Sequence, residues 1–315
     1  MLVKKLRGGP RAALTVVMVF SGARAASSWA QGPDTARKSA TATPGWGAID
    51  QIMGRAGTTQ PGGVQKYGFP RSDLRVQCGG VTLKPALALG SWVALKGGAS
   101  DTMAMGDLVL TESEVTPVLT KLEKMGVQVT ALHNHILGES PRVMYLHIEA
   151  RGQAIRIAEA VHAALALTGT PPAKPGAPST ETFPLDTARI RAALGYAGTV
   201  NAGVYQVSVP RAETVRVDGM EAPPSMGVAT AINFQPTGDG KAAITGDFVL
   251  TAKEVNPVIE ALRGGGIEIT AVHSHMLTEE PRLFFLHYWA NADAAALARG
   301  LRRALDRMNV KKANS

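Results

Sequence analysis

The sequence has few of the residues that cross-link or stack a protein core. Its 315 residues include one cysteine, Cys78, so no disulfide can form within the chain. Aromatic residues make up only 5% of the chain, so we expect a core of Val, Leu, Ile, Ala and Met. Contents of 45% hydrophobic and 18% charged residues are typical of a globular protein, and 315 residues predict two domains.

The sequence also lacks an N-terminal apolar run long enough to cross a bilayer. Residues 12–20, AALTVVMVF, follow four basic residues and precede a small-residue pattern that ends at Ala25. This order predicts a signal peptide and leader over residues 1–31, with cleavage after Ala25 or Ala30. Nine apolar residues are too few for a helix across a bilayer of about 30 Å. We therefore expect an exported protein, periplasmic or extracellular, that is soluble and has no transmembrane helix after signal cleavage.

Most of the excess positive charge belongs to this leader. The formal net charge of +8 falls to +3 without residues 1–31, because they hold five basic residues and no acidic ones. The remaining near-balance argues against nucleic acid as a partner. We interpret the basic stretch at 299–312, RGLRRALDRMNVKK, as the solvated face of a terminal helix.

The chain repeats itself with an offset of 140 residues. The stretch GDLVLTESEVTPVLTKLEKMGVQVTALHNH, from Gly106, aligns without a gap on GDFVLTAKEVNPVIEALRGGGIEITAVHSH, from Gly246. A proline-rich segment at 170–183 separates the copies and predicts a stiff linker. We predict a tandem duplication, with a first repeat domain at 46–169 and a second at 184–309, related by a pseudo-twofold axis or a translation.

Each repeat is predicted to be an α+β sandwich. In the first repeat we expect a short helix at 46–53, strands near 64–69, 73–77, 90–96 and 103–110, and then a helix opened by a capping box. That capping box is formed by Thr111 and Glu114, although Pro117 predicts a first turn that is distorted or begins later. Strands at 127–135 and 142–150 and a helix at 153–168 follow. The order strand–helix–strand–strand–helix, with extra N-terminal strands, predicts helices on one face of a sheet. We expect the earlier strands either to extend that sheet or to form a small adjoining one.

Histidines gather in one hairpin of each repeat. Six of the seven histidines occupy repeat-matched positions, which are His133, His135 and His147 with His273, His275 and His287. Alternation along a strand puts His133 and His135 on one face. If paired residue numbers across the hairpin sum to about 280, His147 lies opposite His133, and a slip of two leaves it on the same face. Three imidazoles on one face predict a divalent metal site in each repeat.

Charged residues flank both hairpins. Glu139 and Glu279 are candidates for a fourth ligand or a general base, and Arg142 and Arg282 for binding a carboxylate or phosphate. Zinc suits neutral imidazole, and nickel, copper and iron remain alternatives. The alternative to a metal site is a structural network in which the histidines are hydrogen-bonded and Glu139 or Arg142 holds the hairpin.

The motifs GDLVLTESEV and VTALHNHILGESPRVMYLHIEA, with their second-copy partners, resemble the LppY/LpqO family of exported bacterial proteins. The resemblance covers nearly all of the chain after the leader. That family is a domain family of unknown function whose name comes from lipoproteins, whereas this chain has no cysteine after its apolar run. The resemblance implies no activity that can be carried onto particular residues.

Two functions remain open at this point. The first is an exported cell-envelope protein that binds a divalent metal or a small anionic ligand through the His-rich hairpin of each copy, with a small ligand or an envelope component as its partner. The alternative is a metal-dependent hydrolase of the cell envelope, in which Glu139 or Glu279 activates a metal-bound water.

Overall fold

The computed structural model describes residues 45–173 and 183–312. The predicted leader at 1–31 and most of the predicted linker lie outside these residues. The elements of the first repeat are α1 (Trp46–Met53), β1 (Thr58–Gln60), β2 (Val64–Pro70), β3 (Gln77–Cys78), β4 (Val81–Thr82), α2 (Pro85–Ala88), β5 (Gly90–Gly97), β6 (Thr102–Thr111), α3 (Glu112–Lys124), β7 (Gln128–His133), β8 (Val143–Gly152) and α4 (Ala154–Leu165).

The second repeat follows the same plan. Its elements are α5 (Thr187–Leu194), β9 (Thr199–Asn201), β10 (Val204–Pro210), β11 (Arg216–Val217), β12 (Met220–Glu221), the 3-10 turn η1 (Pro224–Met226), β13 (Ala229–Gly238), β14 (Lys241–Leu250), α6 (Ala252–Arg263), β15 (Glu268–His273), β16 (Glu279–Glu280), β17 (Phe284–Asp293) and α7 (Ala294–Leu305).

Both repeats build the same six-stranded antiparallel sheet. The strand order is β1-β2-β5-β6-β8-β7 in the first and β9-β10-β13-β14-β17-β15 in the second. The elements β6, α3, β7, β8 and α4 have the predicted order, so the α+β fold and the tandem duplication are confirmed. Of the extended segment expected at 73–77 only Gln77 is in a strand, and β3 and β4 form a small ribbon outside the sheet, which is one of the two placements expected for the earlier strands.

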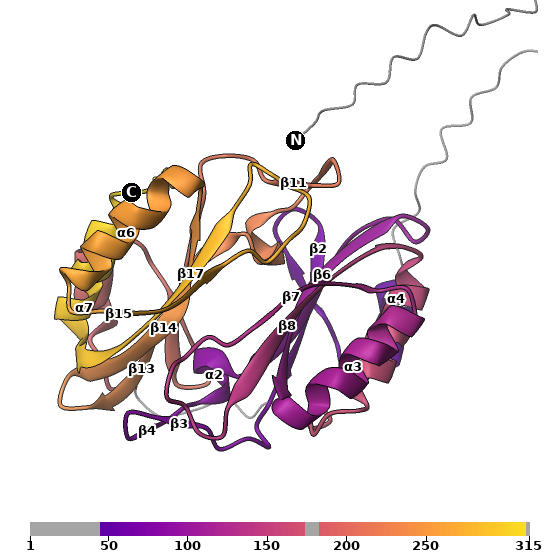
Figure 1. The fold of residues 1–315 in the computed structure, drawn as a ribbon, viewed down its shortest axis with the longest axis horizontal. Coiled ribbons are helices and arrows are strands. Elements are labelled where there is room, and N and C mark those ends of the chain that lie inside the picture. Colours follow the sequence, from indigo (N-terminus) through magenta and orange to yellow (C-terminus); the bar gives the residue numbers. More distant parts are fainter. Residues whose placement is uncertain (1–44, 174–182, 313–315) are drawn as a thin grey trace, which may run out of the picture. The chain divides into compact units, whose positions relative to one another are not determined.

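The helices of each repeat cover one face of its sheet. Figure 1 shows α3 and α4 along the outer side of β6, β7 and β8, and α6 and α7 along the outer side of β14, β15 and β17. Apolar side chains from these helices pack on the sheets in two separate cores, one in each repeat. This burial is what the helical spacing of the apolar residues predicts.

The other faces of the two sheets pack against each other. Two further apolar clusters contain side chains of both repeats: Met105 of β6 lies in one with Phe285 of β17, and Tyr145 of β8 lies in the other with Trp289 of β17. Each hairpin is therefore buried against the opposite repeat. Since the repeats share these clusters, neither sheet face that carries the histidines is open to solvent.

A pair of reciprocal hydrogen bonds defines how the repeats are related. The Thr130 hydroxyl donates to the carbonyl oxygen of His275 at 2.6 Å, and the Thr270 hydroxyl donates to the carbonyl oxygen of His135. The threonine of each repeat thus bonds to the matched histidine of the other repeat, so the same contact occurs twice with the repeats exchanged. A twofold relation produces such reciprocal contacts and a translation does not, so the repeats are related by a pseudo-twofold axis.

A buried arginine anchors the start of the central helix in each repeat. Arg71 is 1% exposed, and its guanidinium donates to Glu114 at 2.7 Å and to the carbonyl oxygen of Val109. Glu114 also accepts from the backbone N–H of Thr111 at 2.8 Å, as the capping box predicts. Arg211 and Glu254 repeat this arrangement in the second copy.

The expectation that Pro117 distorts or delays the first turn is wrong. Helix α3 begins at Glu112, directly after the cap, and runs through Pro117 to Lys124. The missing proline N–H would have bonded the carbonyl of Ser113. Because Ser113 is exposed in the first turn, water can satisfy that carbonyl.

In residues 45–173 and 183–312 we find no helix with the length and apolar character that a membrane span requires.

Candidate metal centre

The histidine hairpins have the same register in both repeats. In the first, Ala131 of β7 lies opposite His147 of β8, and His133 lies opposite Tyr145. Paired residue numbers therefore sum to 278, which is the predicted slip of two that keeps His147 on the face of His133. A bulge between Val129 and Ala131 precedes this part of the ladder, and the second repeat has its own bulge at the matching place.

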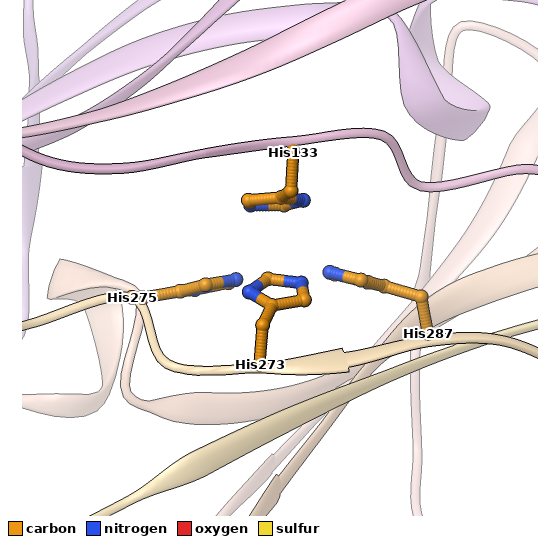
Figure 2. Close-up of side chains that lie close together, drawn as sticks. All are labelled: His133, His273, His275 and His287. Atoms are coloured by element: carbon orange, nitrogen blue, oxygen red, sulfur yellow. The ribbon is translucent and has the colours of Figure 1, made fainter.

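The imidazoles of each repeat converge as predicted. Ligand atoms of His133, His135 and His147 all lie within 4.8 Å of one another. Those of His273, His275 and His287 meet the same limit together with His133 of the first repeat. Figure 2 shows His133 pointing down from its own strand onto the ring of His273, with His275 and His287 on either side.

The two predicted sites are in fact one. Ring centroids within a repeat are 4.8–5.7 Å apart, for example 5.0 Å between His133 and His147 and 5.7 Å between His275 and His287. Three pairs between the repeats are closer, the first being His133 and His273 at 3.6 Å. The other two are His135 with His287 at 3.9 Å and His147 with His275 at 3.6 Å, while His133 lies 5.1 and 5.2 Å from His275 and His287. The expectation of a separate site in each repeat is therefore corrected to a single six-histidine cluster, because the two hairpin faces are pressed together.

The two nitrogens of each ring in the six-histidine cluster have different surroundings. All six Nε2 atoms are buried, and none has a hydrogen-bond partner among the described residues. The Nδ1 atoms of His133 and His273 instead lie 3.3 and 3.2 Å from the carbonyl oxygen of the following residue, and Nδ1 of His287 lies 3.1 Å from the Gly246 carbonyl. A carbonyl only accepts, so these Nδ1 atoms carry the proton and Nε2 keeps its lone pair.

Burial keeps the imidazoles neutral. It is the main cause that lowers the pKa of His147 to about 3 and the pKa of His273 to about 4. The same cause, reinforced by neighbouring histidines, lowers the pKa of His133, His135 and His275 below the usual range. At neutral pH these five rings are in the neutral form, in which one ring nitrogen has a lone pair that can bind a metal.

Two aspartates that the sequence reading missed complete the centre. Asp107 of β6 pairs in register with His147, and Asp247 of β14 with His287. Oδ1 of Asp247 lies 2.8 Å from Nδ1 of His287. A carboxylate oxygen of Asp247 and ring nitrogens of His135 and His287 all lie within 4.8 Å of one another. The signal was present in the Gly-Asp that opens both copies of the aligned motif, but only the ladder register brings these carboxylates to the histidines.

The aspartates differ in protonation. Burial raises the pKa of Asp107, and the neighbouring charge of Asp247 raises it further. Burial alone would raise the pKa of Asp247 as well, yet the contact with His287 and the nearby histidines lowers it below the ordinary value. The centre therefore carries one carboxylate that stays ionised and one that tends to hold a proton.

The flanking glutamates bond to the backbone of their own hairpins. Oε1 of Glu139 accepts from the N–H of Val143 at 3.2 Å, and Oε1 of Glu279 accepts from the N–H of Leu283 at 2.9 Å. Neither carboxylate joins the converging groups of ligand atoms found among the described residues. Burial raises the pKa of Glu139 to about 7. Their predicted roles as ligand or base stay predictions.

The flanking arginines point away from the six-histidine cluster. Arg142 is exposed and lies 3.6 Å from Glu112 of α3. Arg282 is half exposed and donates to Glu279 at 3.2 Å and to the carbonyl oxygen of Leu277. Their proposed contact with an anionic ligand also stays a prediction.

Comparison with known proteins places the duplicated unit in a family. The model of the family described as Domain of Unknown Function (DUF1259) matches residues 47–167 and again residues 188–307, most of the chain. The chain belongs to this family. Comparison with curated proteins gives no match.

Among solved structures, the DUF1259 chain is similar to two proteins at low scores. One is a trimeric bacterial microcompartment shell protein, PduB, with 12% identity over 80% of this chain and 90% of that one and a TM-score of 0.20. The other is EtuB from Clostridium kluyveri, with 11% identity over 79% and 88% and a TM-score of 0.19. Similarity at this level carries no argument about the DUF1259 chain.

Proposed function

We propose that this DUF1259 chain binds a divalent transition metal at the six-histidine cluster. The observation that carries the proposal is the set of six buried Nε2 atoms, which converge from both repeats without a partner among the described residues. A buried polar atom without a hydrogen bond costs about 1–3 kcal/mol. Six such atoms at one point are a large penalty in the free protein, and metal binding removes the part that belongs to the nitrogens it ligates.

The spacing of the donors fits such an ion. Two nitrogens bound to one tetrahedral zinc at about 2.0–2.1 Å are about 3.4 Å apart. The ligand atoms of His133, His273, His275 and His287 all lie within 4.8 Å of one another, so their rings need to close by at most about 1.4 Å. Neutral imidazoles with one ionised aspartate suit zinc, and also nickel, copper and iron. The metal would act there as a Lewis acid or as a bridge between the repeats.

The structural alternative has less support. It required a hydrogen-bond network in which Glu139 or Arg142 holds the hairpin and the histidines have partners of their own. Glu139 does hold the hairpin through the N–H of Val143, but Arg142 lies beside Glu112 and the Nε2 atoms have no partners among the residues described. The carbonyl contacts of three Nδ1 atoms are the outer contacts that metal-binding histidines ordinarily make.

Export to the cell envelope is a second part of the proposal. It is supported by the basic, apolar and small-residue order of residues 1–31, together with the resemblance to the LppY/LpqO family. Binding of a small anionic ligand at Arg142 or Arg282 would be a separate property, since both side chains point to solvent. The hydrolase alternative has less support, because neither Glu139 nor Glu279 joins the converging ligand atoms found among the described residues.

The experiment is metal analysis of the purified protein with two matched variants and a control. His135→Ala and His275→Ala come from opposite repeats but from the same six-histidine cluster. We expect each alone to remove most of the bound metal, because the repeats share one centre. His162→Ala, an exposed histidine on α4, should keep the wild-type metal content. A wild type that contains no metal after reconstitution with zinc, nickel, copper or iron would refute the proposal.

A further inference from the structure

A cavity opens between the repeats on one side of the six-histidine cluster. It has a volume of about 170 Å³ and is lined by residues of β6, β7 and β8 and by the β11–β12 turn of the second repeat. Gln128, Arg151 and Asp218, which line it, are exposed. This outer cavity therefore meets solvent.

A second, smaller cavity, nearer the histidines, shares one lining residue with it. This inner cavity, of about 20 Å³, is lined by His147 of the first repeat and His275 of the second. Its volume is that of about one water-sized probe. Glu149 is the one residue that lines both cavities, so its carboxylate lies between the solvent and the six-histidine cluster.

The two cavities follow neighbouring rows of side chains on the buried face of the first sheet. Along β8 the row is Arg151, Glu149 and His147, and each step inward is two residues. The row on β6 pairs with it in register, Met103 with Arg151 and Met105 with Glu149. The path from the surface to His147 is thus built by one pair of strands.

Glu149 is unusual for its position. Its side chain is 7% exposed, and its buried Oε1 has no hydrogen-bond partner among the described residues. No basic side chain pairs with it there, because Arg151 forms its ion pair with Asp101 at 2.9 Å. Asp218 adds a second carboxylate to the outer cavity. The carboxylates of Glu149 and Asp218 offer oxygen donors to a cation on this path.

The second repeat closes the equivalent path with a large side chain. At the position of Glu149 it has Trp289, which is 8% exposed and packs in an apolar cluster with Cys78 and Val81. Its partners in register on β14 and β15 are Thr245 and Glu268. The pseudo-twofold symmetry of the histidines therefore does not extend to their access from solvent.

We propose that divalent cations reach the six-histidine cluster from the first-repeat side, through the outer and inner cavities, with Glu149 as the residue that binds them in transit. This inference rests on the proposed metal-binding function. Glu149 acts on the rate of loading in this scheme, whereas the histidines set how much metal is held at equilibrium. The two properties can be measured separately.

The test uses the purified protein stripped of metal, with Zn²⁺ alone as the probe. Zinc uptake is followed in a stopped-flow instrument against a chromophoric chelator, and the zinc content is measured at the end. Glu149→Gln keeps the side-chain volume and should slow uptake about tenfold without changing the final zinc content. Glu149→Trp, which copies the second repeat, should slow it further. The matched control Glu268→Gln removes a carboxylate at the equivalent mouth of the second repeat and should leave the rate unchanged.

A second measurement protects the test against misfolded variants. A cysteine at exposed Gln128, blocked with a bulky maleimide, should slow uptake, and a blocked cysteine at Glu268 should not. Wild type treated in the same way corrects for Cys78. If Glu149→Gln and blocked Gln128→Cys both take up zinc at the wild-type rate, the path is overturned while zinc binding is left intact. A lower final zinc content in Glu149→Gln would overturn it by making Glu149 a ligand. Wild type without zinc at equilibrium would refute the proposed function itself.

Discussion

The imidazoles of His133 and His273 are 140 residues apart in the sequence, and their ring centroids lie 3.6 Å apart on the pseudo-twofold axis. Each ring comes from the last residue of an edge strand, β7 or β15. Their contact adds to the reciprocal threonine bonds that join the two hairpins. A ligand held here is therefore bound by both repeats, and its effect on stability should be felt by the whole duplicated unit.

Zinc should stabilise the protein against heat. A ligand present at about 100 times its Kd adds roughly 2.7 kcal/mol to the free energy of unfolding, which corresponds to about 5–10 °C in Tm for domains of this size. We expect that shift in scanning calorimetry for wild type and its reversal by a chelator. The double variant His133→Gln with His273→Gln should show no shift, and a shift of wild-type size in it would place the metal elsewhere.

The reciprocal threonine bonds should stabilise the contact between the repeats. Thr130→Val keeps the shape of the side chain and removes its hydrogen bond to the His275 carbonyl, so we expect a loss of about 1 kcal/mol. Thr270→Val should cost a similar amount for the same reason. Urea unfolding measures both. Thr116→Val, on the exposed side of α3, is the control and should change the free energy of unfolding by less than about 0.5 kcal/mol.

The buried Arg211–Glu254 pair should make part of the stability depend on acid. Although burial opposes it, the hydrogen bonds from Arg211, Thr251 and Asn309 lower the pKa of Glu254 from 4.5 to about 2. A carboxyl with a lowered folded-state pKa contributes stability above its unfolded pKa and loses it as the pH falls toward the folded value. At pH 7, Glu254→Gln should cost roughly 3 kcal/mol, because it removes the more buried of the two carboxylates that pair with buried Arg211, the other being Glu213.

The gap between wild type and Glu254→Gln should narrow between about pH 4.5 and pH 2. Chemical unfolding at several pH values measures it. Glu260→Gln, on the same helix, is the control for a carboxylate outside this pair. A gap that stays constant down to pH 2 would contradict the role assigned to the ion pair.

Gly246 should tolerate no side chain. A Cβ at this position would overlap the carbonyl oxygen of Ala231 and lie 3.0 Å from the Tyr288 hydroxyl. Because the obstacle is backbone in the middle of a sheet, Gly246→Ala should cost more than about 3 kcal/mol. Gly68→Ala meets nothing within 4 Å and should change the free energy of unfolding by less than about 1 kcal/mol. Thermal unfolding of the two variants checks the difference, and equal midpoints would show that the sheet yields at Gly246.

Local signals predicted the elements that build the hairpins. Thr111 and Glu114 predicted the start of α3, and alternation after Gly126 predicted that His133 and His147 share a sheet face. Both predictions depend on local contacts, within one or two turns of a helix or between two paired strands. Most of the segment at 73–77 was mistaken for a strand. Its Val76 packs in an apolar cluster that the opposite repeat helps to build, and local periodicity does not register such contacts.

The sequence by itself determined that the chain is a duplication, that each copy is an α+β unit and that three histidines of each copy lie on one face. These follow from periodicity, capping and the 140-residue offset, which act over short distances or within aligned copies. Only the tertiary structure decided that the two faces meet, that six histidines form one cluster with Asp107 and Asp247, and that Glu149 opens a path which Trp289 closes. The physical reason is that sheet-on-sheet packing depends on the shape and burial of whole surfaces, and no spacing along the chain encodes which surface covers which.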